Sequence, residues 1–341
     1  TGAGALAWQR PAGGVVSLDF NADSLTSLDS LVAWLVGPDT TAQASERSLR
    51  GAAHVLLALE GALDSLTIEA RGTTERLRWR DWEVPAGHAR LAYQPGPDPG
   101  VRFDGTLDSL RYRGFAFGGA SASGRGTRDS LTWFARSRFG DVGAFVTGGR
   151  LARGAQGAGH PAAVAVGIDS LSVLLPGDVW LLQHPVEVIV NDSGIAVAGV
   201  AIHSLSDSGR IVLDGTIPAR GAVHARAGIE AFPLAGVYAL LERDTTGVGG
   251  TITASVGLVG TRADPVYVGA FAVNNGALRG FRTPVVDGTF GYRERRLDAE
   301  LHLFRASEPI LTVSAQLPLD LSLIPVADRE LPDSLSVGVR P

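Results

Sequence analysis

Side chains that carry out metal or acid–base chemistry are scattered along this sequence of 341 residues. Asp298 and Glu300 stand two residues apart, as the catalytic carboxylates of a β-helix lyase do on a strand. The alternate positions from Leu297 to Leu303 are all apolar, however, and this favours a strand with one solvated and one buried face. The seven histidines include no pair at the close spacing of a zinc site, and they occupy positions 54, 88, 160, 184, 203, 224 and 302. We therefore predict neither a metal site nor a catalytic pair.

Residues that nucleophilic and cofactor-dependent enzymes need are missing or wrongly surrounded. The chain has no cysteine, and all 30 of its Lys and Arg residues are arginine, which excludes a lysine Schiff base and a phosphate-loop lysine. Ser121 lies between Ala120 and Ala122, without the flanking glycines of a nucleophile elbow. The glycine clusters at 118–126 and 247–250 complete no phosphate-loop or dinucleotide motif and predict turns. We expect no enzymatic activity and no cofactor.

Charged side chains also give little sign of a polyanionic partner. The net charge of −5 provides no general attraction to nucleic acid. Arg76, Arg78 and Arg80 alternate with Leu77 and Trp79, so three guanidinium groups are expected on one face of a strand. They suit either a phosphate-binding ridge or, as we prefer, the solvated outer face of a one-sided sheet.

The stretch 251–280 shows the elements that must position any functional side chain. Apolar and small polar residues alternate over 251–258, a period of two that predicts a strand with one apolar face. Residues 260–265 predict a turn, and a second strand is expected over 266–273. Asn274, Asn275 and Gly276 tolerate positive φ and predict a tight hairpin.

The same rhythm predicts roughly twenty strands along the chain. The tripeptide Asp-Ser-Leu recurs seven times, most often at predicted strand ends, and residues 233–242 carry the one helical pattern. We expect a first sheet region over 1–149, a flexible loop over 150–160 and a second sheet region over 161–341. No apolar run approaches the ~20 residues of a membrane-spanning helix. With no methionine, the chain is expected to be part of a longer protein whose anchor lies elsewhere.

Two blocks of sequence, taken one after the other, carry a recognisable series of turns and strands. The first is GIDSLSVLLPGDVWLLQHPVEVIVNDSGIAVAGVAI with GRIVLDGTIPARG and EAFPLAGVYALLE. The second is GGTITASVGLVGTRADPVYVGAFAVNNGALRG with VVDGTFGYRERRLDAELHLF and ILTVSAQLPLDL. This order, a Pro-Leu helix, a Gly-Thr turn with Pro, an Asn-Gly turn and a closing Leu-Pro-Leu, resembles the TamB family of AsmA-like bridge proteins. The matching positions are Gly260, Thr261, Pro265, Asn275, Gly276, Leu317, Pro318 and Leu319.

The resemblance implies an elongated β-taco, an open β-solenoid groove of many short strands with an apolar interior, in the periplasm. A TamB-like protein would conduct glycerophospholipids between the inner and outer membranes and support outer-membrane protein assembly beside a TamA-type barrel. Its inner-membrane anchor would lie in a part of the parent chain outside this sequence. We expect acyl chains on a floor of alternate strand residues, namely Ile252, Ala254, Val256, Leu258, Leu297, Ala299, Leu301, Leu303, Leu311, Val313, Ala315 and Leu317.

Two alternatives share the strand pattern. A surface adhesin or autotransporter-type β-solenoid would have a closed, dry core. A polysaccharide-active β-helix enzyme would need acidic side chains clustered across neighbouring turns.

Overall fold

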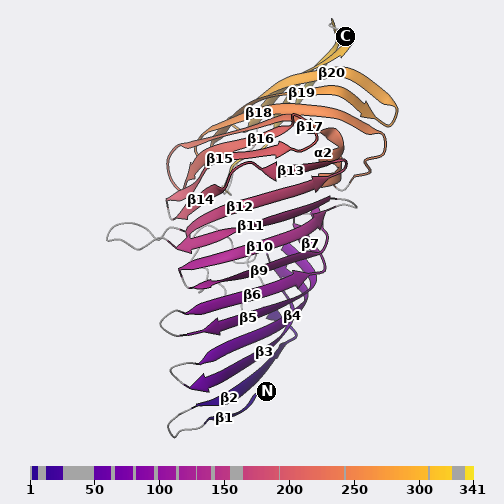
Figure 1. Cartoon of the computed structure of the whole chain (residues 1–341). Helices are drawn as coiled ribbons and strands as arrows, with labels where there is room; N and C mark the ends of the chain where they lie inside the picture. The colour runs from indigo at the N-terminus through magenta and orange to yellow at the C-terminus, as the bar shows by residue number, and fades with distance from the viewer. Residues whose placement is uncertain are drawn as a thin grey trace. The chain divides into compact units, whose positions relative to one another are not determined.

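A computed structural model describes most of the chain, namely residues 2–6, 13–25, 50–62, 66–79, 82–95, 99–112, 115–127, 129–139, 143–153, 164–191, 193–241, 243–305, 308–324 and 335–341. These residues form 23 strands and one short helix, which confirms the predicted all-β class (Figure 1). The chain divides into two compact units, Thr1–Ala152 (unit 1) and Arg153–Pro341 (unit 2). The division falls within the predicted flexible loop 150–160. Residues 150–153 of that loop belong to strand β11, and residues 154–160 lie outside the described residues.

Unit 1 is an antiparallel sheet in which strands that follow one another in the chain lie side by side, from indigo to magenta in Figure 1. After β6 the order continues through β9, β10 and β11, while β7 pairs with β5 and β8. The strands are β1 (Gly2–Leu6), β2 (Gly13–Ala22), β3 (Arg50–Ala62), β4 (Thr67–Trp79), β5 (Trp82–Gln94), β6 (Gly100–Leu107), β7 (Leu110–Tyr112), β8 (Phe115–Phe117), β9 (Ala120–Thr127), β10 (Ser130–Phe139) and β11 (Gly143–Arg153).

A line of irregular residues, which we call the crease, crosses unit 1 from strand to strand. It starts at Gly51 in β3 and Arg76 in β4, where φ is +124° and +52°. Pro85 of β5 falls at the register position of Arg76, between the pairs Glu75–Ala86 and Leu77–Val84, and as a proline it can donate no ladder hydrogen bond. The breaks at 108–109, between β6 and β7, and at 118–119, between β8 and β9, extend the line. Because bulges bend the strands that carry them, the crease turns one margin of the sheet.

Unit 2 is a second antiparallel meander, in which β12 pairs with both β13 and β14 and the order then runs from β15 to β23. Its elements are β12 (Val164–Leu175), β13 (Asp178–Leu182), β14 (Val186–Asn191), β15 (Gly194–Ser204), β16 (Arg210–Pro218), β17 (Val223–Pro233), α2 (Leu234–Leu240), β18 (Val248–Gly260), β19 (Pro265–Leu278), β20 (Phe281–Arg293), β21 (Arg296–Arg305), β22 (Glu308–Pro318) and β23 (Ser336–Arg340).

The hairpin predicted at Asn274–Gly276 is wrong. Asn275 does have the expected positive φ of +52°, but β19 continues through it to Leu278. The turn lies at Arg279 and Gly280, both with positive φ, which is the geometry of a two-residue hairpin loop. Asn275 is a bulge instead, because a left-handed residue serves a bulge as well as a turn.

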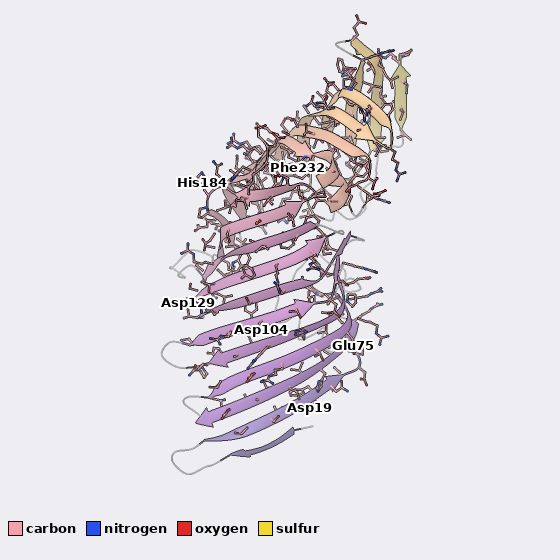
Figure 2. All side chains as sticks on the ribbon, turned by 45° about the vertical axis from the view of Figure 1, so that its right-hand side comes forward. Asp19, Glu75, Asp104, Asp129, His184 and Phe232 are labelled. Carbon is pink, nitrogen blue, oxygen red and sulfur yellow. The ribbon has the colours of Figure 1, made fainter. Side chains whose placement is uncertain are left out.

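Helix α2 covers one end of the unit 2 sheet, and its bounds agree with the predicted helix. Its buried residues Gly236 and Ala239 face a cluster that includes Leu175, Trp180 and Phe232 (Phe232 in Figure 2). Trp180 is 1% exposed, and its ring centroid lies 4.9 Å from that of Phe232. In the described part of the chain, no helix has the length and apolar character needed to cross a membrane.

The segment 319–324, which we call the strap, closes the opposite end of β18–β22. The backbone N–H of Leu321 donates to Tyr292 Oη at 2.9 Å, and Tyr267 Oη donates to the Leu321 carbonyl at 3.2 Å. The N–H of Leu323 donates to the carbonyl of Arg262, in the turn between β18 and β19. Because β22 is three strands from β19 in the ladder, the strap shows that this part of the sheet curls.

Candidate functional site

The twelve predicted lining residues all lie on one face of β18–β22. On β21 and β22 they stand directly opposite each other as Leu297 with Leu317, Ala299 with Ala315, Leu301 with Val313 and Leu303 with Leu311. Ile252, Ala254, Val256 and Leu258 of β18 reach the same rows through their partners on β19 and β20. Leu258 is buried and the other eleven are half-buried.

Two phenylalanine rings fill much of the space between these predicted residues. A Cβ atom built on Gly269 would lie 2.3 Å from Phe290 Cζ, and one built on Gly288 would lie 2.8 Å from Phe271 Cε1. Each ring therefore covers a glycine on the neighbouring strand, which packs the centre of the face closely. Binding of lipid at these twelve positions stays a prediction.

A more open apolar surface lies on one face of unit 1, which we call the inner face. Its central row consists of small residues that stand opposite one another on five neighbouring strands. Four spacings of ~4.8 Å give this row a length of about 19 Å across the strands. Ala89 and Ala122 of the row are exposed to solvent. The row is Gly72, Ala89, Gly105, Ala122 and Ala135.

Larger apolar side chains border the row of small residues on both sides. Leu91 and Phe103 stand on one side, two residues from Ala89 and Gly105 on their strands, and Leu107 and Phe145 stand on the other. Because Gly and Ala are much shorter than Leu and Phe, the row forms the floor of a groove. Leu91 is 45% exposed, an open position for a leucine.

A cavity of about 750 Å³ occupies this groove, within the usual size range of small-molecule sites. Its inner-face side chains come from strands β3 to β11 and are apolar except for Ser137. Trp82 stands at the margin with its ring centroid 4.4 Å from that of Tyr112. His88, Arg90, Thr106 and similar outer-face residues also border the cavity, which they reach through the backbone because the floor side chains are so short.

Charged groups in this part of unit 1 lie on the opposite, outer face. Glu69 accepts from Arg71 and Arg90 at 2.9 and 2.6 Å, and the hydrogen bond from Arg71 is the main reason why the pKa of Glu69 is lowered. His54 Nε2 lies 2.8 Å from Asp19 Oδ1. The groove thus offers an apolar ligand a floor without ionic anchors.

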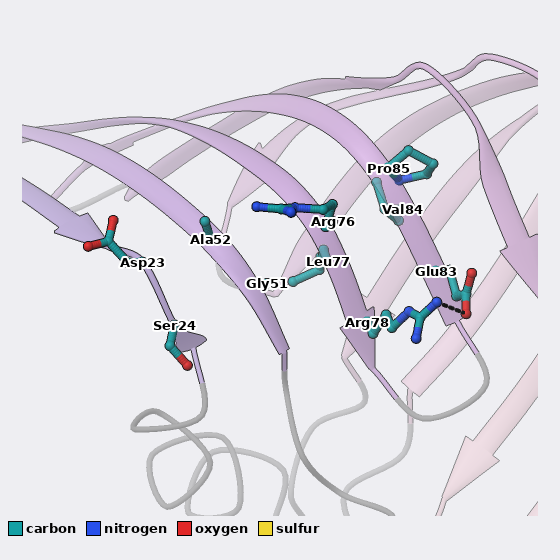
Figure 3. A pocket seen from close by; sticks show the side chains of 10 residues that line it. All are labelled: Asp23, Ser24, Gly51, Ala52, Arg76, Leu77, Arg78, Glu83, Val84 and Pro85. Carbon is teal, nitrogen blue, oxygen red and sulfur yellow. Dashed lines mark ion pairs between the residues drawn. The ribbon is translucent and has the colours of Figure 1, made fainter.

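A second pocket of about 460 Å³ lies at the crease and contains two of the three arginines of the predicted ridge (Figure 3). Arg78 pairs with Glu83 at 3.0 Å, whereas the Arg76 side chain points the other way, toward Ala52. The positive φ of Arg76 breaks the alternation on which the ridge depended. Arg80 lies outside the described residues, and the described arginines form no ridge.

The residues considered for catalysis have ordinary structural surroundings. His302 Nδ1 lies 3.1 Å from Asp287 Oδ1, and its Nε2 lies 3.5 Å from Glu300 Oε1. Asp298 and Glu300 are exposed, as expected for a solvated face. Ser121 Oγ accepts from Arg136 Nε at 2.9 Å. Among the described residues, no group of three or more His, Asp or Glu side chains has the arrangement of a metal site.

The sequence did not predict the unit 1 groove, because no single strand carries a pattern that indicates it. The Gly and Ala residues of β4, β5, β6, β9 and β10 become a row only when the strand registers are known. The available signal was a Gly or Ala at the centre of each of these strands, flanked two residues away by a larger apolar side chain on some of them.

Comparison with protein families, curated proteins and solved structures found no match for this chain.

Proposed function

We propose that the inner-face groove of unit 1 binds the acyl chain of a lipid. The observation that carries this proposal is the apolar cavity of about 750 Å³ above the row of small residues. An acyl chain is linear, unbranched and without hydrogen-bonding groups, which matches a straight floor of Gly and Ala bordered by Leu and Phe. The row of about 19 Å exceeds the ~15 Å depth of one leaflet of a bilayer core, so a membrane acyl chain fits along it.

Binding in such a groove is expected to be weak enough for a lipid to move on. At ~0.3 kcal/mol per atom, a chain of about 16 carbons gains roughly 5 kcal/mol, which corresponds to a dissociation constant between roughly 1 mM and 1 µM. The apolar lining contains no ionic anchor that would hold a chain at one position. These properties suit a protein that conducts lipids, and the exposure of Leu91 favours it over an adhesin-type solenoid with a closed core.

The wider role follows from the resemblance to the TamB family. We propose transport of glycerophospholipids between inner and outer membranes, with the chain in the periplasm and a TamA-type barrel as partner in outer-membrane protein assembly. The resemblance also places acyl chains on the one-sided apolar face of unit 2, where β21 and β22 carry half-buried apolar rows beside the Phe-packed centre.

Ala89→Phe tests acyl-chain binding, with His88→Phe as the matched control. Both changes place the same ring on β5, but Ala89 lies on the groove floor whereas His88 lies on the outer face. A ring across the middle of the floor removes contact with about half the chain, roughly 2.5 kcal/mol, so an environment-sensitive fluorescent fatty acid should bind more than tenfold more weakly. His88→Phe should bind as the unsubstituted chain does. Equal affinities for the two variants, both with unchanged circular dichroism, would refute the proposal.

A further inference from the structure

The outer face of unit 1 is strongly basic over its last strands. Strands β9, β10 and β11 contain five arginines and no acidic residue. Four of the five are exposed on the outer face, although the chain as a whole has a net charge of −5. These four are Arg125, Arg136, Arg138 and Arg150.

Two arginines stand directly opposite each other at the edge of this basic surface. Arg102 of β6 and Arg125 of β9 are cross-strand partners, and both are exposed. Like charges in directly opposed positions destabilise a sheet. Neither forms an ion pair with another described residue.

A second pair of opposed arginines shows how the sheet relieves such repulsion elsewhere. Arg71 of β4 stands opposite Arg90 of β5, also on the outer face. Glu69 lies between them and binds both guanidinium groups, at 2.9 and 2.6 Å. Asp104 stands two residues from Arg102 on the same face, as Glu69 does from Arg71, but it forms no ion pair with Arg102 or Arg125 among the described residues. The space between these two guanidinium groups is therefore open to an anion from outside.

The surroundings of Arg102 and Arg125 form a pocket rather than a flat surface. It has a volume of about 380 Å³ and lies on the outer face, because its exposed lining side chains alternate with Phe103, Gly124 and Trp133 along the three strands. The exposed lining residues are Arg102, Asp104, Ser123, Arg125, Thr132 and Phe134. Asp104 is labelled in Figure 2.

We propose that this pocket binds a phosphate group. Guanidinium groups bind phosphate oxygens by paired, charge-assisted hydrogen bonds, and one phosphate between Arg102 and Arg125 would neutralise both. The Ser123 hydroxyl can donate to a third oxygen, whereas the Thr132 hydroxyl already donates to the Arg125 carbonyl at 2.9 Å. The Asp104 carboxylate repels a bare phosphate and accepts a hydrogen bond from a hydroxyl or amine beside it. Phe134, 46% exposed, offers an apolar contact to the rest of the ligand.

The phosphate can belong to a small soluble ion or to a lipid headgroup. Inorganic phosphate and vesicles of phosphatidylglycerol in phosphatidylcholine present the same group in the two forms. Binding of both fits a site open to either source, and binding of the vesicles alone assigns the site to a headgroup held by further contacts. The sheet separates this pocket from the inner-face groove, so the site does not depend on acyl-chain binding.

The decisive variant of the full chain is Arg102→Gln/Arg125→Gln, and its matched control is Arg71→Gln/Arg90→Gln. Both remove two opposed arginines from the same face, but only the second pair is bound by a carboxylate, that of Glu69. We expect calorimetric titration with phosphate, at constant ionic strength, and vesicle cosedimentation to show at least about tenfold weaker binding for the first variant, the factor that corresponds to ~1.4 kcal/mol. The control should bind nearly as the unsubstituted chain does.

Asp104→Asn provides a second readout, because it removes the one carboxylate of the pocket without removing an arginine. Inorganic phosphate should then bind more tightly than to the unsubstituted chain. The proposal is overturned if the unsubstituted chain binds neither probe, or if the two double variants lose binding equally, since that result would reflect general basic charge.

Discussion

The contact between Phe290 and Gly269 in unit 2 gives the sharpest test of how the predicted apolar face is packed. In Gly269→Ala, the new Cβ atom would lie 2.3 Å from Phe290 Cζ and 2.7 Å from the carbonyl oxygen of Ser255. The backbone φ of Gly269 is not in the left-handed region, so steric contact is the main effect of the substitution.

The size of the destabilisation by Gly269→Ala depends on which atoms must move to admit the new Cβ atom. The Phe290 ring has to withdraw by about 1 Å to reach van der Waals distance, and the Ser255 carbonyl belongs to the ladder and can yield little. Overpacking of this kind costs about 1–3 kcal/mol, and we expect about 2–3 kcal/mol because side chain and backbone are both crowded. For a unit the size of unit 2, the thermal midpoint should fall by roughly 4–12 °C.

Gly291→Ala is the matched control, since Gly291 follows Phe290 directly and a Cβ atom there meets nothing within 4 Å. It should be neutral or stabilise by about 0.4–1 kcal/mol through the unfolded state. Scanning calorimetry of the full chain measures the midpoints, and hydrogen exchange in β19 and β20 assigns the change to unit 2. Adding Phe290→Leu to Gly269→Ala should recover part of the loss. Equal midpoints for Gly269→Ala and Gly291→Ala would refute the packing described above.

Two further predictions concern the hydrogen bonds that tie the ends of unit 2. Burial raises the pKa of Asp178, but hydrogen bonds from the Ser204 hydroxyl and from Ser206 and Val179 outweigh it, so the pKa is lowered from its ordinary value of 3.8. Because the folded-state pKa of Asp178 is lowered, its ionised carboxylate stabilises the folded chain above pH ~4, and this contribution is lost as the pH falls through the folded-state pKa. Asp178→Asn should therefore lower the free energy of unfolding, measured in urea, by about 1–2 kcal/mol at pH 7 and by progressively less below pH ~4. A difference that stays constant at all pH values would contradict this assignment. Tyr292→Phe leaves the Leu321 N–H without its acceptor at 2.9 Å, so hydrogen exchange of this amide should accelerate and the free energy of unfolding should fall by about 1–2 kcal/mol. Tyr267→Phe, which removes the hydrogen bond of 3.2 Å, should have a smaller effect. An unchanged exchange rate at Leu321 would show that other contacts hold the strap.

The fold class was readable from the sequence because the period of two is a local signal. Alternation over 251–258 predicts an apolar face whatever the neighbouring strand is, and the structure places all four apolar residues of β18 on one face. The signal for helix α2 was equally local, since Pro233 and the spacing of the apolar residues after it define where the helix starts. The hairpin at Asn274–Gly276 failed because positive φ is shared by turns and bulges, and only strand pairing distinguishes the two.

The functional surfaces were less predictable because they arise across strands. The twelve predicted residues share a face, but the Phe rings that close it come from β19 and β20, whose glycine partners could not be assigned without the register. Strand β9 reads ASASGRGT, with little hydrophobic content of its own. Its Ala122 becomes a groove floor, and its Arg125 a charged neighbour of Arg102, only through its pairing with β6.

The small floor residues and the opposed arginines are two consequences of the same pairing between β6 and β9. Because Gly105 stands opposite Ala122, the side chains on the inner face of these strands extend little beyond the backbone, which leaves room for an apolar ligand. The outer face of the same strands carries Arg102 and Arg125, which are both exposed, so solvent screens most of their mutual repulsion. Their direct pairing matters instead because it sets two guanidinium groups side by side, an arrangement that one phosphate can bridge. One strand register therefore favours an acyl chain on one face and a phosphate on the other.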